Sequence, residues 1–346
     1  MQPMTQHTAE QTAFLRQRMP QAYAPVKPIV DALRTFLADP SNVSAPASAA
    51  QSRKLLIGLE DPEQNTPVET LQDTVRRAAD SLKLDSQSAS ACFMLARAIT
   101  ELARFDEDVY HPGPLRDALE FAEKAKALAP KVGKAWRAVI EARIRLARFD
   151  MAADMLGELQ RLGIAPGTHA ALMAMLCERQ HLLEDACGWY EKAAVYATNS
   201  ARRAELYTLQ ALDYISLNRK SDADRAFMLA LLEGGQQPWI AHNWSVLKNE
   251  MGNAWAAVEL NRRALMWDPG FEAAQEFRDF LQNAFKELKR IWPQAQVMQE
   301  EQLRGIALPG CDAEVIAKFS LQPWTEPRRG ERAKATRTFR TGLEEI

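Results

Sequence analysis

A small residue recurs along this chain at intervals that a stack of similar helical hairpins requires. The residues are Ala152, Ala186, Ala223 and Ala257, and the intervals between them are 34, 37 and 34 residues. A residue without a bulky side chain lets two helices approach closely, and a fixed period of about 20–50 residues is the signature of a repeat architecture. The spacing therefore predicts a chain built from hairpins that stack on their neighbours.

The residues that follow the last three alanines share one helical pattern. A large residue comes four positions later and a further alanine seven positions later, giving Tyr190 and Ala193, Phe227 and Ala230, and Asn261 and Ala264. Asn261 departs from the pattern, because an aromatic or large apolar residue is expected there. The last unit contains the turn Met251-Gly252-Asn253, where glycine supplies the positive φ of a tight turn, and it closes at Pro269.

The pattern extends upstream of Ala152. The segment 136–143 reads as the first helix of the unit that contains Ala152, and the segments 89–99 and 118–125 read as the two helices of an earlier unit. The connection within that earlier unit is about nine residues longer than in the others and carries residues 106–114. Residues 70–82 resemble one more second helix.

Together these segments resemble the tetratricopeptide repeat (TPR) superfamily over residues 70–290, in five units and without a match to a particular subfamily. The resemblance implies an all-α, right-handed α-solenoid of TPR-type helix-turn-helix repeats with flanking helices. It divides the chain into an N-terminal helical and linker region (1–64), a TPR array with a C-terminal capping helix (65–290), and a partly flexible, basic C-terminal extension (291–346). A composition rich in Ala, Leu, Arg, Glu and Gln supports the all-α prediction.

The flanks contain further candidate elements. Residues 9–19 and 25–37 are amphipathic, residues 39–52 read as a Ser-, Ala- and Pro-rich linker, and residues 271–292 form an amphipathic segment that should cap the stack. The tail from Pro323 onward carries six arginines and lysines from Arg328 to Arg340. We favour a solvated terminus for this tail over a docking arm for an acidic partner or nucleic acid.

In TPR solenoids the first helices of the repeats line a concave face, and the resemblance assigns twelve residues of this chain to that face. These residues are Arg97, Lys134, Arg137, Arg145, Leu172, Met175, Arg179, Leu209, Leu212, Trp239, His242 and Asn243. Arginines capture carboxylates through paired hydrogen bonds, and an exposed apolar strip favours burial of a partner's side chains. We therefore expect a partner protein or peptide segment with acidic and hydrophobic residues. The amphipathic flanks leave a second possibility, namely that the N- or C-terminal helices of the chain occupy the groove.

Signs of catalytic or metal chemistry are weak. His169, Cys177, His181 and Cys187 lie close together in sequence, but the repeat phase places Cys177 in the core, His181 in a turn and Cys187 beside a close helix contact. We expect no metal site, cofactor or catalytic residue, because phosphate-binding loops, dinucleotide-binding turns and nucleophile elbows do not occur. A net charge of −2 gives no reason to expect nucleic-acid binding.

The predicted function is a non-catalytic scaffold or adaptor that binds a partner segment in the groove. An alternative is a regulatory or targeting subunit of an enzyme, such as a glycosyltransferase, or of a secretion complex. Residues 1–17 lack the apolar core of a signal peptide, and no apolar run approaches the roughly 18 residues that a membrane span needs. Four scattered cysteines suit reduced thiols. These features predict a cytoplasmic protein without a membrane segment.

Overall fold

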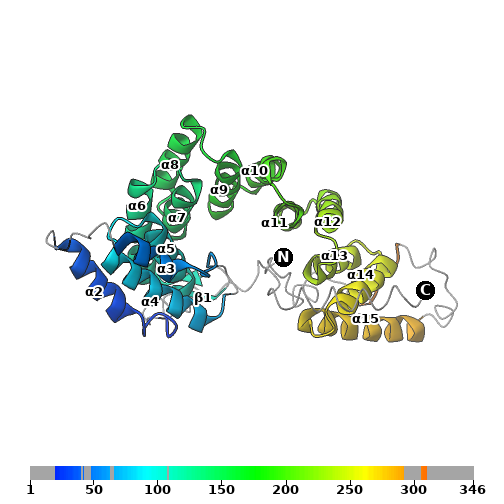
Figure 1. Ribbon diagram of the computed structural model, residues 1–346. Coiled ribbons are helices and arrows are strands. Elements are labelled where there is room, and N and C mark those ends of the chain that lie inside the picture. Colours follow the sequence, from blue (N-terminus) through cyan, green and yellow to red (C-terminus); the bar gives the residue numbers. More distant parts are fainter. Residues whose placement is uncertain are drawn as a thin grey trace, which may run out of the picture. The chain divides into compact units, whose positions relative to one another are not determined.

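The computed structural model describes residues 20–39, 42, 48–62, 66–106, 109–291 and 305–309 (Figure 1). These residues are almost entirely helical, and consecutive helices pack side by side, which confirms the predicted all-α solenoid class. The chain divides into two compact units on either side of the link between Gln180 and His181. We call them the N-terminal unit and the C-terminal unit and describe each separately.

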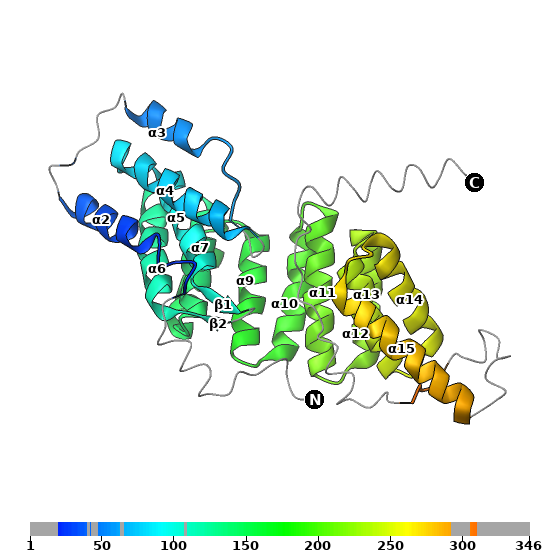
Figure 2. The same ribbon diagram turned by 90° about the horizontal axis from the view of Figure 1, so that it is seen from below.

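The N-terminal unit contains eight of the described helices and a short hairpin of strands. The helices are α2 (Lys27–Ala38), α3 (Ser48–Leu56), α4 (Val68–Leu84), α5 (Ala89–Leu102), α6 (Pro112–Leu128), α7 (Gly133–Arg145), α8 (Phe149–Arg161) and α9 (Pro166–Arg179). α5 pairs with α6 and α7 with α8, and the first helices α5, α7 and α9 also contact one another in a row. α2 and α3 both pack on α4 (Figure 2).

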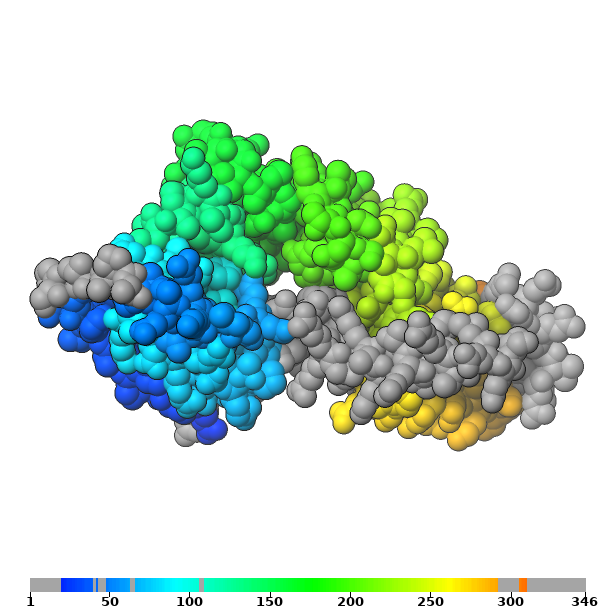
Figure 3. All heavy atoms as spheres, in the orientation of Figure 1, coloured from blue at the N-terminus to red at the C-terminus, as the bar shows by residue number. Residues whose placement is uncertain are grey.

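The C-terminal unit contains α10 (Leu183–Tyr196), α11 (Ser200–Ser216), α12 (Lys220–Gly234), α13 (Pro238–Glu250), α14 (Ala254–Trp267) and α15 (Glu272–Ile291). α11 pairs with α12 and α13 with α14, and α15 packs on α13 and α14. The buried face of α15, which lies in the segment predicted to cap the stack, includes Ala274, Phe277 and Leu281. Space-filling Figure 3 shows that, within each unit, side chains fill much of the space that the ribbons of Figure 1 leave between neighbouring helices.

The recurring alanines lie where the pattern predicts. Ala152, Ala186, Ala223 and Ala257 are all fully buried. The residue five positions before each alanine adopts a left-handed backbone, with φ of 56° at Ala147, 60° at His181, 58° at Asn218 and 75° at Gly252. Helices commonly end on such a residue, because it lets the next amide groups bond back to the last carbonyls. Accordingly, the amides of Arg148, Arg219 and Asn253 each bond to a carbonyl five residues earlier.

The long connection of the first hairpin folds into strands rather than remaining a plain loop. β1 (Arg104–Asp106) and β2 (Val109–Tyr110) pair antiparallel, with Arg104 opposite Tyr110. The imidazole of His111 then caps α6 by accepting a hydrogen bond from the Gly113 amide at 3.0 Å. The short ribbon therefore replaces the tight left-handed turn that joins the helices of the other pairs.

Part of the predicted linker is helical. We predicted a linker over residues 39–52, but α3 begins at Ser48, so the prediction is wrong from that residue onward. The contact of α3 with α4 is polar: the hydroxyls of Ser52 and Ser81 share a hydrogen bond of 2.7 Å in the interior, and Ser48 bonds to the Leu84 carbonyl. A helix that buries serine rather than leucine lacks the apolar periodicity from which helices are predicted. One of the predicted amphipathic segments, residues 9–19, lies outside the described residues.

One first helix is longer than the rest. α11 has 17 residues, whereas α7 and α13 have 13 each. The longest interval between recurring alanines, from Ala186 to Ala223, spans this helix. The additional residues of that repeat are therefore accommodated as helix and not as a loop.

Candidate functional site

Charged side chains of α5 and α7 meet across the contact between these two first helices. Arg97 and Glu101 lie one turn apart on α5, and Arg137, Glu141 and Arg145 follow one another at intervals of one turn on α7. Side chains spaced by four residues share a face of a helix. Because α5 and α7 contact each other, the charged side chains on their facing sides come close together.

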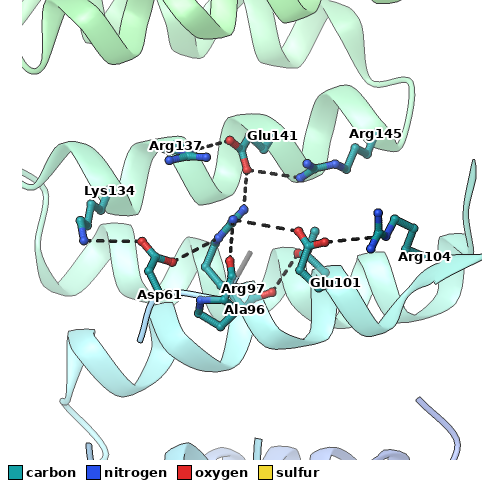
Figure 4. Close-up of polar contacts among 11 residues, drawn as sticks. Asp61, Ala96, Arg97, Glu101, Arg104, Lys134, Arg137, Glu141 and Arg145 are labelled. Atoms are coloured by element: carbon teal, nitrogen blue, oxygen red, sulfur yellow. Dashed lines mark hydrogen bonds and ion pairs between the residues drawn. The ribbon is translucent and has the colours of Figure 1, made fainter. Parts of the chain in front are cut away.

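We define the arginine–carboxylate cluster as the eight charged residues drawn in Figure 4. They are Asp61, Arg97, Glu101, Arg104, Lys134, Arg137, Glu141 and Arg145. Three predicted groove arginines and one predicted lysine therefore lie in one site. Its three carboxylates, Asp61, Glu101 and Glu141, are not among the twelve residues that the resemblance assigned to the concave face.

Glu141 is the centre of the cluster. Its two carboxylate oxygens accept from Arg137 Nε at 2.6 Å, Arg97 Nη1 at 2.7 Å and Arg145 Nη1 at 3.3 Å. Burial by itself raises the pKa of this carboxyl, but the guanidinium groups of Arg137, Arg97 and Arg145 outweigh it and hold the pKa well below its usual range. Glu141 is therefore ionised at neutral pH.

A loop segment of the chain itself contacts the cluster. Leu59 packs against the core of the unit, and the chain continues without regular structure to Pro62. Arg97 Nη2 donates to the Pro62 carbonyl at 2.8 Å, and Arg97 Nε lies 3.5 Å from an Asp61 carboxylate oxygen. The other Asp61 oxygen lies 3.5 Å from Lys134 Nζ. Asp61 thus bridges α5 and α7 from outside the helices.

The second end of the cluster approaches the β1–β2 ribbon. Arg104 Nε of β1 lies 3.9 Å from Glu101, and the guanidinium of Arg145 lies over the Tyr110 ring of β2, 4.9 Å from its centre. Burial lowers the pKa of Arg145, but Tyr110, Glu141 and Glu101 raise it by a larger amount, so this guanidinium stays charged. The long connection of the first hairpin is therefore part of the site.

The cluster has an excess of positive charge and an exposed edge. Its five cationic side chains face three carboxylates. Lys134 is 68% exposed and Arg137 is 41% exposed, whereas Arg97 and Glu141 are nearly inaccessible. An anion that approached α7 from solvent would meet Lys134 and Arg137 first. This geometry suits recognition of a carboxylate.

The three predicted groove residues of α9 differ in accessibility. Met175 and Arg179 are partly exposed, and α9 packs beside α7, so these two side chains are on the helix next to the cluster. Leu172 is buried in the core. The prediction that Leu172 lines an open surface is therefore wrong, because its side chain packs within the row of helices.

The predicted groove residues of the C-terminal unit divide in the same way. Leu209 and Leu212 on α11 are partly exposed. Trp239, His242 and Asn243 on α13 are buried, which corrects their assignment to an open face. His242 is enclosed because the capping helix and the residue before it cover the ring, with the rings of Phe271 and Phe277 at 5.2 and 5.9 Å.

His242 has an unusual environment for an imidazole. Neither ring nitrogen makes a hydrogen bond within the described part of the chain. Burial lowers the pKa of His242 to about 4, and the nearby amide of Asn261 only partly offsets this effect. Asn261, the residue that departed from the repeat pattern, is buried beneath α15 and donates to the Ala274 carbonyl at 3.0 Å. A polar residue thus replaces the expected apolar one where the cap is anchored.

The histidines and cysteines considered for a metal site have structural surroundings. Cys177 and Cys187 are buried, as the repeat phase predicted, and His181 is the left-handed residue of a turn. Cys187 Sγ contacts the Gln210 carbonyl, and the Gln210 amide donates to the Cys187 carbonyl at 3.1 Å. Over the described ranges, no group of three or more His, Cys, Asp or Glu side chains is arranged so that it could hold a metal ion. In the same ranges, no helix combines the length and apolar composition of a transmembrane segment.

No family model and no curated protein matches the sequence. Among solved structures, the chain is similar to Cut9 in the APC/C hetero-tetramer Cut9–Hcn1, at 13% identity and a TM-score of 0.50, over 78% of this chain and 48% of Cut9. It is also similar to PilF of Pseudomonas aeruginosa, at 15% identity and a TM-score of 0.46, over 67% of this chain and 96% of PilF. A third match is YrrB, a TPR protein with a peptide-binding site, at 15% identity and a TM-score of 0.39, over 58% of this chain and 97% of YrrB. The chain spans about half the length of Cut9, and at 13% identity the likeness to Cut9 concerns the fold alone.

Proposed function

We propose that this chain, which has the fold of tetratricopeptide repeat proteins, is a non-catalytic interaction scaffold whose N-terminal unit binds an acidic segment of a partner protein. The observation that carries the proposal is the excess of cations in the arginine–carboxylate cluster, with Lys134 and Arg137 at its exposed edge. A protein of this fold, Cut9, forms a hetero-tetramer with Hcn1. Folds of this kind serve many partners, so the partner class has to be argued from the site itself.

The chemistry of the cluster favours a carboxylate-bearing ligand. Guanidinium groups bind carboxylates through charge-assisted hydrogen bonds that are about twice as strong as neutral ones. Arg97 and Arg145 are already charged and held in position by Glu141, so a ligand does not have to order them. Preorganised donors reduce the conformational entropy that binding costs. Met175 on the neighbouring α9 offers a polarizable apolar contact for a hydrophobic residue of the same segment.

Partly exposed leucines give the C-terminal unit a separate apolar contact. Leu209 and Leu212 lie three residues apart on α11, so they share a face of that helix. We include them in the proposal as a second place where hydrophobic side chains of a partner bind. They carry less weight than the cluster, because single exposed apolar residues are common on protein surfaces.

Peptide selection with matched charge variants tests the proposal. A library of short random peptides would be selected on immobilised wild-type protein, on Lys134→Glu and on Lys131→Glu. Lys131 is exposed and lies three residues before Lys134, outside the cluster, so its reversal changes the net charge equally. We expect Asp- and Glu-rich peptides from the wild type and from Lys131→Glu. Against Lys134→Glu, their affinity should fall about tenfold, equivalent to about 1.4 kcal/mol.

Two results would contradict the proposal. One is a set of selected peptides without acidic enrichment. The other is equal affinity of acidic peptides for Lys134→Glu and wild type, which would place their site elsewhere. A full-length partner that proved to be an enzyme would instead support the alternative function, a regulatory or targeting subunit.

A further inference from the structure

The segment 59–62 lies on the arginine–carboxylate cluster in the way that a bound peptide would. It has no regular secondary structure, its apolar Leu59 packs against the core, and its acidic Asp61 faces cations of both α5 and α7. Its backbone contributes as well, since the Pro62 carbonyl accepts a hydrogen bond from Arg97 at 2.8 Å. One apolar side chain, one carboxylate and one backbone carbonyl are a typical set of contacts for a short extended ligand.

We infer that Leu59–Pro62 is an intramolecular ligand that competes with the partner, and that the partner segment carries the same chemistry, an acidic residue followed by proline. The inference rests on the proposed function, because it concerns the same site. It differs from the sequence expectation that a terminal helix fills the groove, since the segment is a loop between α3 and α4.

The contacts of Asp61 are weak enough to be exchanged. Both of its oxygens lie 3.5 Å from the cationic nitrogens that they face, whereas Glu141 is held at 2.6 and 2.7 Å by two arginines. Charge-assisted bonds are strongest at about 2.7–2.9 Å. Lys134 is largely exposed, so its pair with Asp61 is screened by water and salt. Glu141 therefore belongs to the permanent structure, and Asp61 is the member that a stronger acidic ligand can replace.

The chain around the segment is arranged for local movement. Before it, Arg77 of α4 holds the end of α3 by donating to the carbonyls of Leu55 at 2.9 Å and Ile57 at 2.8 Å. Gly58 follows with a φ of 78° and has no neighbouring atom within 4 Å of the position that a Cβ would occupy. Glycine has more backbone freedom than other residues. Because Gly58 follows the part of the chain that Arg77 holds, residues 59–62 can leave the surface without unfolding α3.

A labelled peptide with the sequence of residues 57–62, Ile-Gly-Leu-Glu-Asp-Pro, tests the inference by direct binding to the full chain. In the wild type the internal segment reduces the fraction of accessible sites, and apparent affinity falls by that fraction. We expect Asp61→Asn to bind the peptide about tenfold more tightly than the wild type. The control Glu69→Gln removes a carboxylate from the exposed first turn of α4 and should bind like the wild type.

The outcomes separate the two proposals. Suppose that wild type and Asp61→Asn bind the labelled peptide with equal affinity, and that the double variant Asp61→Asn/Lys134→Glu does not bind it. This result would overturn the internal competitor and leave the proposed function standing. Absence of binding to every form, together with no acidic enrichment in the peptide selection, would overturn both.

Circular dichroism would verify that each variant is folded, and Asp61→Ser would serve as a second variant, because it also removes the charge. A peptide in which Ala replaces the residue equivalent to Pro62 should bind several-fold more weakly, since proline preorganises extended backbone.

Discussion

Among the described residues, Glu141 is the carboxylate closest to Arg97, at 2.7 Å. Asp61 contacts Arg97 at 3.5 Å, and Glu101 contacts it only at 4.0 Å. Without the Glu141 carboxylate, Arg97 and Arg145 would remain buried with weaker pairing. Removal of one member of a buried ion pair leaves an uncompensated charge, which is more costly than the loss of an exposed pair.

We therefore expect Glu141→Gln to lower the free energy of unfolding of the N-terminal unit by about 3–5 kcal/mol. Glu123→Gln is the matched control, because Glu123 pairs with Arg143 at 2.8 Å but is 48% exposed. An exposed pair contributes about 0–1 kcal/mol. Urea unfolding followed by circular dichroism measures both. Equal losses in the two variants would show that the cluster is not held together by Glu141.

Backbone strain is a second property of single residues, and a left-handed residue recurs in the turns that precede α8, α10, α12 and α14. Four turns use a left-handed residue, but only Gly252 adopts this conformation at little steric cost. For an L-residue the left-handed region costs roughly 1–2 kcal/mol. Ala147 is the clearest case, since it is exposed and has no side-chain polar group that could offset the strain.

At the scale of the element, the turn between α7 and α8 can thus be improved. We expect Ala147→Gly to raise the free energy of unfolding by about 0.5–1 kcal/mol, the relief of strain less the larger entropy of glycine in the unfolded chain. The control is Ala197→Gly, at the C-terminal end of α10, where φ is −68° and glycine relieves no strain. That variant should be neutral or destabilising. A destabilised Ala147→Gly would contradict the role of this turn.

The elements differ in how far the sequence predicts them. Helices whose buried side chains are alanine and large apolar residues were predicted, as α8, α12 and α14 were from Ala152, Ala223 and Ala257. α3 was missed because its buried contact is made by Ser52, a residue that also favours turns and linkers. The β1–β2 ribbon was missed because five residues in two short strands show no detectable alternation.

The site was predicted in part, and for a definable reason. Repeat phase identifies which residues of α5 and α7 share a face, so Arg97, Arg137 and Arg145 could be selected from the sequence. Asp61 lies outside the repeats, and its contact with Lys134 spans 73 positions along the chain, which no local pattern encodes. His242 was assigned to an open face because the repeat alone does not show that Phe271 and Phe277 of the cap cover it.

At the scale of the whole molecule, we expect the two units to respond to acid in different pH ranges. His242 belongs to the C-terminal unit and has a folded-state pKa of about 4, below its ordinary value of 6.5. The unfolded chain therefore binds more protons between these values, and stability is lost as the pH falls from 6.5 towards 4. Glu141 belongs to the N-terminal unit, and its pKa is also lowered. Its contribution persists down to about pH 4.3, the ordinary pKa of glutamate, and is lost only below that value.

We accordingly predict that the C-terminal unit weakens first on acidification. Between pH 6.5 and 4 its free energy of unfolding should fall by up to about 1.4 kcal/mol per pH unit, the linkage of one proton. Hydrogen exchange read separately for α13–α15 and α5–α7 measures the two units in the same sample. His242→Leu should remove this slope from the C-terminal unit, and His181→Leu, at the exposed turn, should leave it in place. A slope that is unchanged in His242→Leu would contradict the assignment.

The extra length of α11 has a consequence for how repeats of this chain can vary. Consecutive residues of a helix are offset by 100° about its axis, so an insertion of three residues advances the following side chains by 300°, close to a full revolution. The interval of 37 residues therefore keeps Thr208 and Ala211 directed inward, where both are fully buried. An insertion of one or two residues would turn that face by a large angle and expose it. Length changes in the helices of such an array are restricted to near-whole revolutions, whereas a connection such as the β1–β2 ribbon can grow by any number of residues.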